Sequence, residues 1–221
     1  TANGILFRND DRNHTRTEEA VRASWELKPT LFVFSEVELN QRTFERAAQS
    51  DGIRRDSSGE RYRVGLAFGN TGKTLRGEIS IGYGTQRPDD PRLADVSGVL
   101  LDSNLAWRLS ELTSLLFTAR SDVSETTTAF SPGVLTHQVG IEARHAFLRH
   151  LIGSAGISYT TQDFARVAID EKEWRSALGL EYFLNREAVL FGTYARTAFS
   201  SSQPHADYTS DELRVGVRLR R

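Results

Sequence analysis

The sequence predicts an all-β fold, an antiparallel transmembrane up-and-down β-barrel of about 12 strands, from three observations. Eleven stretches alternate apolar with polar or small residues, and none shows a helical period. The links between these stretches alternate between tight turns and long polar loops. The last stretch interleaves Leu213, Val215, Val217 and Leu219 with three arginines and a glycine. A sheet with one apolar and one charged face suits a closed barrel that meets lipid outside and water inside.

Composition limits the alternatives. The chain has 221 residues and a net charge of −1, which argues against a generally basic nucleic-acid binder. It contains no cysteine, so it has neither a disulfide framework nor a thiolate metal site. No apolar run approaches the roughly 20 residues of a membrane helix, whereas a barrel strand needs only about 9 to 11. We expect one barrel domain over residues 1–221, or the C-terminal part of a longer barrel.

The first six strands are assigned from their alternate apolar residues. They are expected at residues 14–27 (Val21, Ala23, Trp25, Leu27), 30–44 (Leu31, Val33, Val37, Leu39), 60–69 (Tyr62, Val64, Leu66, Phe68), 74–86 (Leu75, Ile79, Ile81, Tyr83), 97–109 (Leu101, Leu105, Trp107) and 112–124.

The other five strands follow the same pattern. They are expected at residues 135–148 (Val139, Ile141, Phe147), 151–163 (Ile157, Tyr159), 172–184 (Trp174, Leu178, Leu180, Tyr182), 188–200 and 208–220. Residues 2–7 are a candidate for a twelfth strand, which would give the even count of bacterial barrels.

The links indicate how the barrel sits in the membrane. Short turns are expected at residues 28–29, 70–73, 110–111, 149–150 and 185–187, and long loops at 45–59, 87–96, 125–134, 164–171 and 201–207. In bacterial barrels the short turns face the periplasm and the long loops face outward. The pattern therefore predicts a bacterial outer-membrane protein with a periplasmic C-terminus.

The outward face should carry aromatic residues near the strand ends, where an amphipathic ring suits the lipid headgroup level. The predicted lipid-facing girdle consists of Trp25, Tyr62, Phe68, Tyr83, Trp107, Phe147, Tyr159, Trp174 and Tyr182. A soluble β-sandwich could bury the same residues in its core, but the opposite face of these strands is too charged for such a protein.

The inward face should be the functional surface. Its predicted lumen-facing residues are Arg22, Glu36, Glu38, Arg61, Arg63, Arg76, Glu78, Asp102, Arg108, Arg120, Asp122, Glu142, Arg144, Arg175, Glu181, Arg196, Arg214 and Arg218. Each can form a structural ion pair with a neighbouring strand or contact a solute. Because arginines outnumber acids in this set, the lumen is expected to favour anions.

Some segments resemble chemical motifs. Residues 67–74 resemble a phosphate-binding P-loop, but the strand pattern that follows predicts a hairpin turn without nucleotide binding. The histidines have no metal-ligand spacing and no Gly-x-Ser-x-Gly elbow is present, so we expect no catalytic residue, metal or cofactor. An outer-loop hydrolase would use the acid and histidine residues Asp89, Asp90, Asp163, His205 and Asp207.

Three segments carry a family resemblance: residues 24–30 (Ser-Trp-Glu-Leu-Lys-Pro-Thr), residues 55–59 leading into 62–69, and residues 180–186. They resemble outer-membrane β-barrel porins of alphaproteobacterial type, some members of which are associated with exopolysaccharide export. The resemblance spans most of the chain and implies the fold and the membrane. Its motifs are strand and turn features without a catalytic signature.

Three functions follow from these observations. We first expect porin-like passage of small or extended anionic solutes, including acidic saccharides. The alternatives are a plugged structural or partner-binding barrel that acts through its outer loops, and an outer-membrane hydrolase. The expected partners are outer-membrane lipid, an anionic solute or polysaccharide and other envelope proteins, but not nucleic acid or nucleotide.

Overall fold

The computed structural model describes residues 13–48, 51–69, 74–124, 126 and 131–219, and these residues form one sheet of eleven antiparallel strands. The strands are β1 (His14–Lys28), β2 (Leu31–Phe44), β3 (Ser57–Phe68), β4 (Leu75–Pro88), β5 (Val96–Arg108), β6 (Thr113–Ser124), β7 (Val134–Leu148), β8 (Leu151–Phe164), β9 (Asp170–Phe183), β10 (Ala188–Ser201) and β11 (Tyr208–Leu219). Each strand pairs with the strands that precede and follow it in the chain.

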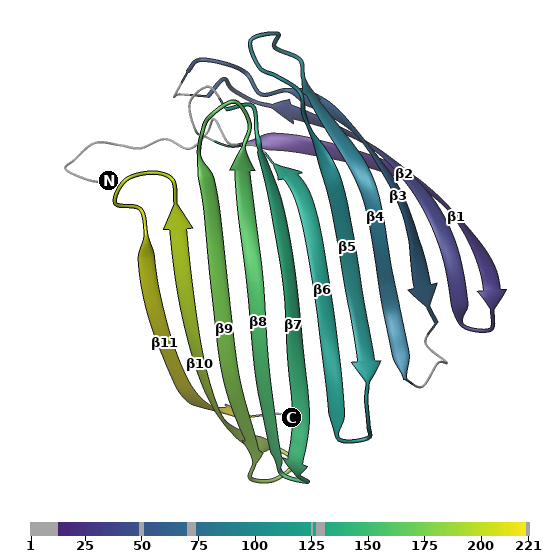
Figure 1. Cartoon of the computed structure of the whole chain (residues 1–221), viewed down its shortest axis with the longest axis vertical. Coiled ribbons are helices and arrows are strands. Elements are labelled where there is room, and N and C mark those ends of the chain that lie inside the picture. Colours follow the sequence, from purple (N-terminus) through teal and green to yellow (C-terminus); the bar gives the residue numbers. More distant parts are fainter. Residues whose placement is uncertain (1–12, 49–50, 70–73, 125, 127–130, 220–221) are drawn as a thin grey trace.

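The sheet curves strongly from β1 to β11, with the short connections at one end and the long ones at the other (Figure 1). Within the described residues β1 and β11 are the two edges and do not pair with each other. The fold is the wall of an up-and-down barrel, as the sequence predicts. The candidate twelfth strand at residues 2–7 lies outside the described residues.

The described part of the chain contains no helix that is both long and apolar enough to cross a membrane.

The strand registers divide the side chains between two faces. On one face Leu180 of β9 lies opposite Gly153 of β8 and Gly192 of β10, and large apolar residues such as Leu178, Leu213 and Val215 are exposed. On the other face Arg61 of β3 reaches Asp122 of β6, with 2.8 Å between nitrogen and oxygen. Side chains three strands apart can meet only across the hollow of a curved sheet, so this second face is concave and the apolar face is convex.

The strand ends show small differences from the sequence prediction: some ends are extended, and others are one residue shorter. The largest is at β3, which begins at Ser57 instead of residue 60. Ser57, Ser58 and Gly59 are typical turn residues, but they pair with Pro88, Arg87 and Gln86 of β4. The neighbouring strand therefore overrides the local turn preference of this segment.

Candidate functional site

The concave face is the candidate functional surface, because its charged side chains converge there from many strands. The registers place the following predicted residues on it: Arg22, Glu36, Glu38, Arg61, Arg63, Arg76, Glu78, Asp102, Arg108, Arg120, Asp122, Glu142, Arg144, Arg175, Glu181, Arg214 and Arg218.

The prediction for Arg196 is wrong. This residue pairs with Ser176 of β9 and Asp211 of β11, on the same face as Tyr194 and Leu213. Its guanidinium lies 3.9 Å from the Asp211 carboxylate. Arg196 therefore belongs to the convex face, near the outer end of β10.

The predicted aromatic girdle lies on the convex face. Tyr62 is opposite Tyr83, Leu75 is opposite Trp107, and the Tyr159 and Trp174 rings pack with centroids 4.4 Å apart. Trp25, Phe68, Phe147 and Tyr182 follow the outward alternation of their own strands.

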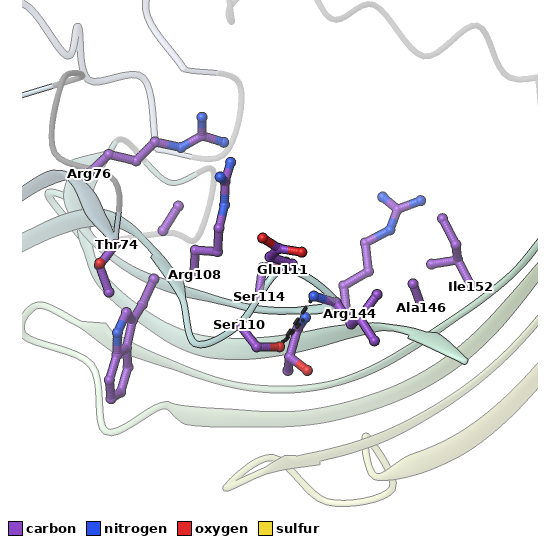
Figure 2. Close-up of a pocket in the computed structure, with 13 residues that line it drawn as sticks. Thr74, Arg76, Arg108, Ser110, Glu111, Ser114, Arg144, Ala146 and Ile152 are labelled. Atoms are coloured by element: carbon purple, nitrogen blue, oxygen red, sulfur yellow. Dashed lines mark hydrogen bonds between the residues drawn. The ribbon is translucent and has the colours of Figure 1, made fainter. Parts of the chain in front are cut away.

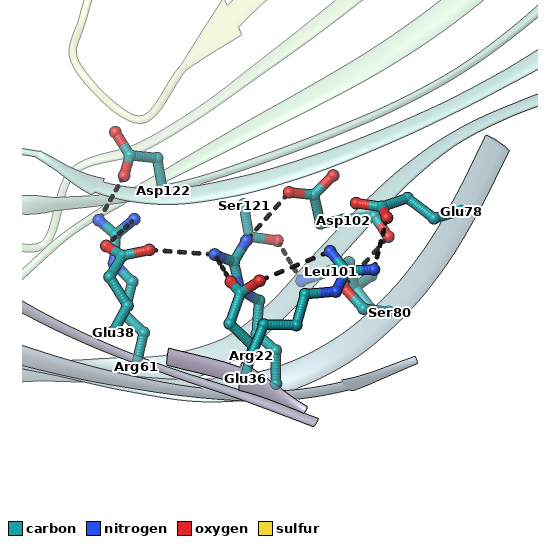
Figure 3. A network of polar contacts seen from close by, with 11 residues as sticks. Arg22, Glu36, Glu38, Arg61, Glu78, Ser80, Leu101, Asp102, Ser121 and Asp122 are labelled. Atoms are coloured by element: carbon teal, nitrogen blue, oxygen red, sulfur yellow. Dashed lines mark hydrogen bonds and ion pairs between the residues drawn. The ribbon is translucent and has the colours of Figure 1, made fainter. Parts of the chain in front are cut away.

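Two arginines of β3 form the centre of an ion-pair network on the concave face (Figure 3). Arg61 contacts Glu38 at 3.4 Å in addition to Asp122, and Arg63 contacts Glu38 at 3.0 Å and Asp102 at 3.2 Å. Arg63 also bonds Glu36. These contacts join β2 and β3 to β5 and β6, and they occupy the concave space between them.

Arg22 extends this network to β1. Its Nη2 lies 2.8 Å from Glu78 Oε2 and its Nη1 lies 3.6 Å from Glu36 Oε2. The Arg22 guanidinium also stacks over the buried Phe34 ring, 3.5 Å from the ring centroid. Bulky and charged side chains thus fill the concave space of the β1–β6 half.

Buried arginines hold the outer end of the same half. Arg42 is only 2% exposed, and its Nη2 donates a hydrogen bond of 2.9 Å to the Val123 carbonyl. Arg55 donates to the Ser131 carbonyl at 2.8 Å and pairs with Asp51 at 2.9 Å. Arg42 thus attaches β2 to β6, and Arg55 attaches the link after β2 to the link before β7.

Sequence reasoning missed both of these arginines. The signal for Arg42 was available, because it continues the inward alternation of Glu36, Glu38 and Asn40 along β2. Arg55 lies in a loop, where no alternation indicates the direction of a side chain.

An arginine-lined cavity of about 640 Å³ lies at the opposite end, beside the short turns (Figure 2). Arg76 of β4, Arg108 of β5 and Arg144 of β7 project into it, over a floor that includes Ser110 and Ser114. Arg144 pairs with Glu181, which also contacts Arg218 at 3.1 Å. Within the described residues, no ion pair or side-chain hydrogen bond is formed by Arg76 or Arg108.

The concave wall beyond this cavity has a patch of small uncharged residues. Ser154 and Ser158 of β8, Gly179 of β9 and Thr193 of β10 occupy inward positions there. Their short side chains leave the space in front of them on β8–β10 open. In the β1–β6 half, the ion-pair network fills the corresponding space.

The concave face also carries acids that the sequence analysis did not assign. Glu26, Glu171, Glu173 and Glu212 occupy inward positions, and Glu212 lies 4.0 Å from Arg175. Glu171 and Glu173 share the alternation of Arg175 and could have been found from it. With these acids added and Arg196 removed, arginines no longer outnumber acids on the described concave face, so the predicted arginine excess over the whole face is wrong. Among the described residues, the inward arginines that form no ion pair are Arg76, Arg108 and Arg120.

The segments and residues considered for chemical roles take part in strands and in structural hydrogen bonds. Residues 70–73 of the P-loop-like segment lie outside the described residues, and Leu75 begins a strand rather than a helix. Asp207 accepts the Ser201 backbone amide at 2.8 Å, and His145 Nδ1 lies 2.8 Å from the Thr113 hydroxyl. No group of three or more histidines and acids in the described ranges could hold a metal ion.

The chain is similar to known proteins in two ways: its sequence matches a family model, and its fold superimposes on solved structures. The family model described as "Putative beta-barrel porin 2" matches residues 1–221. The crystal structure of the outer membrane channel DcaP of Acinetobacter baumannii superimposes with a TM-score of 0.57 at 13% identity, covering 90% of this chain and 60% of that one. A porin structure gives a TM-score of 0.41 at 16% identity, covering 87% and 62%.

No curated protein matches the chain. At 13% identity the likeness to DcaP concerns the fold, and this chain spans 60% of the DcaP chain.

Proposed function

The chain belongs to the putative beta-barrel porin 2 family, and from that premise we propose that it is an outer-membrane channel that conducts small or extended anionic solutes, acidic saccharides among them. Its strands supply the wall of one barrel domain, or the C-terminal part of a longer one. The solute follows the concave face.

The pair Arg76 and Arg108 carries this proposal. Both guanidinium groups project into the cavity at the short-turn end, which Glu111 also lines, and neither forms an ion pair with an acid among the described residues. Fixed positive charge in a confined aqueous space raises the local concentration of anions. By contrast, the arginines of the β1–β6 network are bound to acids and contribute less to the field.

The spacing of the arginines suits an anion with more than one charge. Arg108 and Arg144 both lie opposite Ser114 of β6, on its two sides. Strands in a sheet are about 4.8 Å apart, so the backbones of these two residues are about 10 Å apart. A polyanion that carries several carboxylates or sulfates could contact one guanidinium before it dissociates from the other. Its path would follow the part of the concave face that small residues leave open.

The test is the reversal potential of the full-length protein in a planar bilayer under a KCl gradient. The Arg76→Gln, Arg108→Gln double variant should shift the wild-type preference from anions toward cations. The preference should also weaken at 1 M salt, where the Debye length is only about 3 Å. The matched control is Arg196→Gln, which removes an arginine from the convex face and should leave selectivity unchanged.

Two results would reject the proposed selectivity. One is a wild-type channel that prefers cations. The other is a double variant with the selectivity of the wild type, which would mean that Arg76 and Arg108 do not face the conducting path.

A plugged structural or partner-binding barrel that acts through its outer loops is the second candidate. The ion pairs from β3 to β5 and β6, and the buried Arg42 and Arg55 at the outer end, favour it. Such a barrel would give no steady current in the same bilayer experiment, so one measurement separates the two functions.

A further inference from the structure

An apolar groove of about 570 Å³ crosses the convex face over β7–β11. Gly153, Ala155 and Gly192 lie along it, between larger residues that include Phe147 and Leu180. A second hollow of about 480 Å³ lies on the same face over β2–β5, bordered by Tyr62 and Tyr83.

Gly192 leaves part of the groove empty. A Cβ atom added at Gly192 would meet no heavy atom within 4 Å, although Leu180 lies opposite it on β9. No neighbouring side chain of the described protein fills this space. If this groove in a lipid-facing surface were empty, the residues along its whole lining would lose dispersion contacts. We therefore expect another molecule to fill it.

The short turns at the end of the groove add positive charge. The turn between β7 and β8 contains Arg149 and His150, and the next short turn contains Arg186, all exposed. The Phe183 amide donates to the His150 carbonyl at 2.8 Å, so the two turns are adjacent. In the described part of the chain, Arg149 and Arg186 form no ion pair, and only one acid, Glu187, lies in these turns.

We propose that this groove binds an acyl chain of an anionic phospholipid whose headgroup lies against the short turns. The apolar lining matches the hydrocarbon chain, and exposed arginines at the membrane surface attract anionic headgroups. Since the short turns of bacterial barrels face the periplasm, the lipid comes from the periplasmic leaflet. The proposal depends on the outer-membrane location and not on whether the barrel conducts.

Native mass spectrometry of the full-length protein tests the groove, with phosphatidylglycerol or phosphatidylcholine of identical acyl chains as the added lipid. Wild type should retain phosphatidylglycerol preferentially. Gly192→Leu should lower that retention about tenfold, the loss expected when roughly two methylene groups can no longer be buried. Ala119→Leu is the matched control, since it adds a similar side chain to the convex face outside the groove, and it should retain the lipid.

The headgroup is tested separately. The Arg149→Gln, Arg186→Gln double variant should still bind lipid but should lose the preference for phosphatidylglycerol. Arg92→Gln removes an arginine at the opposite, outer end and should keep the preference. Single-channel conductance should be the same in all these variants, so failure here and failure of the proposed conduction are distinguishable.

Three results would overturn the proposal: unchanged lipid retention in Gly192→Leu, equal retention of the two lipids by wild type, or a lipid-free wild-type oligomer that Gly192→Leu converts to monomer. The last result would assign the groove to a second copy of the chain. If Gly192→Leu fails to fold, as judged by its migration on unheated gels, Ala155→Leu fills the same groove from β8.

Discussion

Arg55 and Asp51 form a buried ion pair in the outer loops, with side chains 5% and 1% exposed. Removal of one partner from a buried pair leaves the other charge uncompensated and typically costs about 3 to 5 kcal/mol. Arg55→Met should therefore open the outer loops, and limited proteolysis between residues 45 and 56 should accelerate. The Asp51→Asn, Arg55→Met double variant should recover part of the loss. Arg92→Met, at an exposed pair, should have little effect, and equal proteolysis of the two single variants would contradict the role of Arg55.

Asp90 offers a second test at the residue scale. The Arg92 guanidinium, and after it the Arg92 backbone amide, lowers the pKa of Asp90 from 3.8 to about 2. Because the folded-state pKa is depressed, the contact stabilises the loop above pH 3.8 and is lost as the pH falls through about 2. The carboxyl carbon resonance of Asp90 should titrate near the lower value in wild type. In Arg92→Gln its midpoint should move toward 3.8, and a midpoint that did not move would assign the shift to the backbone amide alone.

At the scale of the strand, the alternation predicts which way each side chain points only when each face of the strand is chemically uniform and differs from the other. In β9, Trp174, Leu178, Leu180 and Tyr182 alternate with Arg175 and Glu181, and both faces follow from the sequence. In β10, Val189, Phe191 and Phe199 point to the concave side while Leu190 and Tyr194 point to the convex side. Apolar residues on both faces leave the alternation ambiguous, and a shift of one residue reverses every side chain. Arg196 was misplaced for this reason.

The two faces of β9 and β10 should respond differently to the same new charge. Leu180→Arg places a guanidinium in the apolar band and should destabilise the folded protein by about 2 to 4 kcal/mol if the position is near the bilayer midplane. Thr193→Arg, on the concave face beside Gly179, should cost much less because that side chain meets water. Urea titration of the protein folded into lipid vesicles measures both. Equal losses would mean that the two residues share one environment.

At the scale of the whole molecule, the two halves of the sheet differ in how much of the concave space they fill. The ion pairs of Arg61 and Arg63 cross from β3 to β5 and β6, whereas Ser154, Gly179 and Thr193 leave their side open. The alternation predicted which residues face inward. It could not predict that Arg61 meets Asp122, because that contact depends on the curvature of three intervening strand pairs. The same limit applies to the loop contacts of Arg55.

Removal of the crossing side chains should therefore change the size of the conducting path. The Arg61→Ala, Arg63→Ala double variant should increase single-channel conductance, because the side chains that span the concave space are gone. Arg175→Ala, which removes an arginine that pairs with Glu212 two strands away, should have a smaller effect. An unchanged conductance in the double variant would show that ions do not pass beside this network.

The order of the strands in the sheet is the order of the strands in the chain. Every hydrogen-bonded pair in the described sheet therefore joins segments that are sequence neighbours, and most are separated by a short turn or a loop of modest length. Folds with such local contacts pay little loop-closure entropy for each new pairing and fold without long-range searches. Assembly can proceed hairpin by hairpin, with each completed strand serving as the template for the next. The pairing that closes the barrel is the one step that must bring together distant parts of the chain, and it is where a slow phase of membrane insertion is expected.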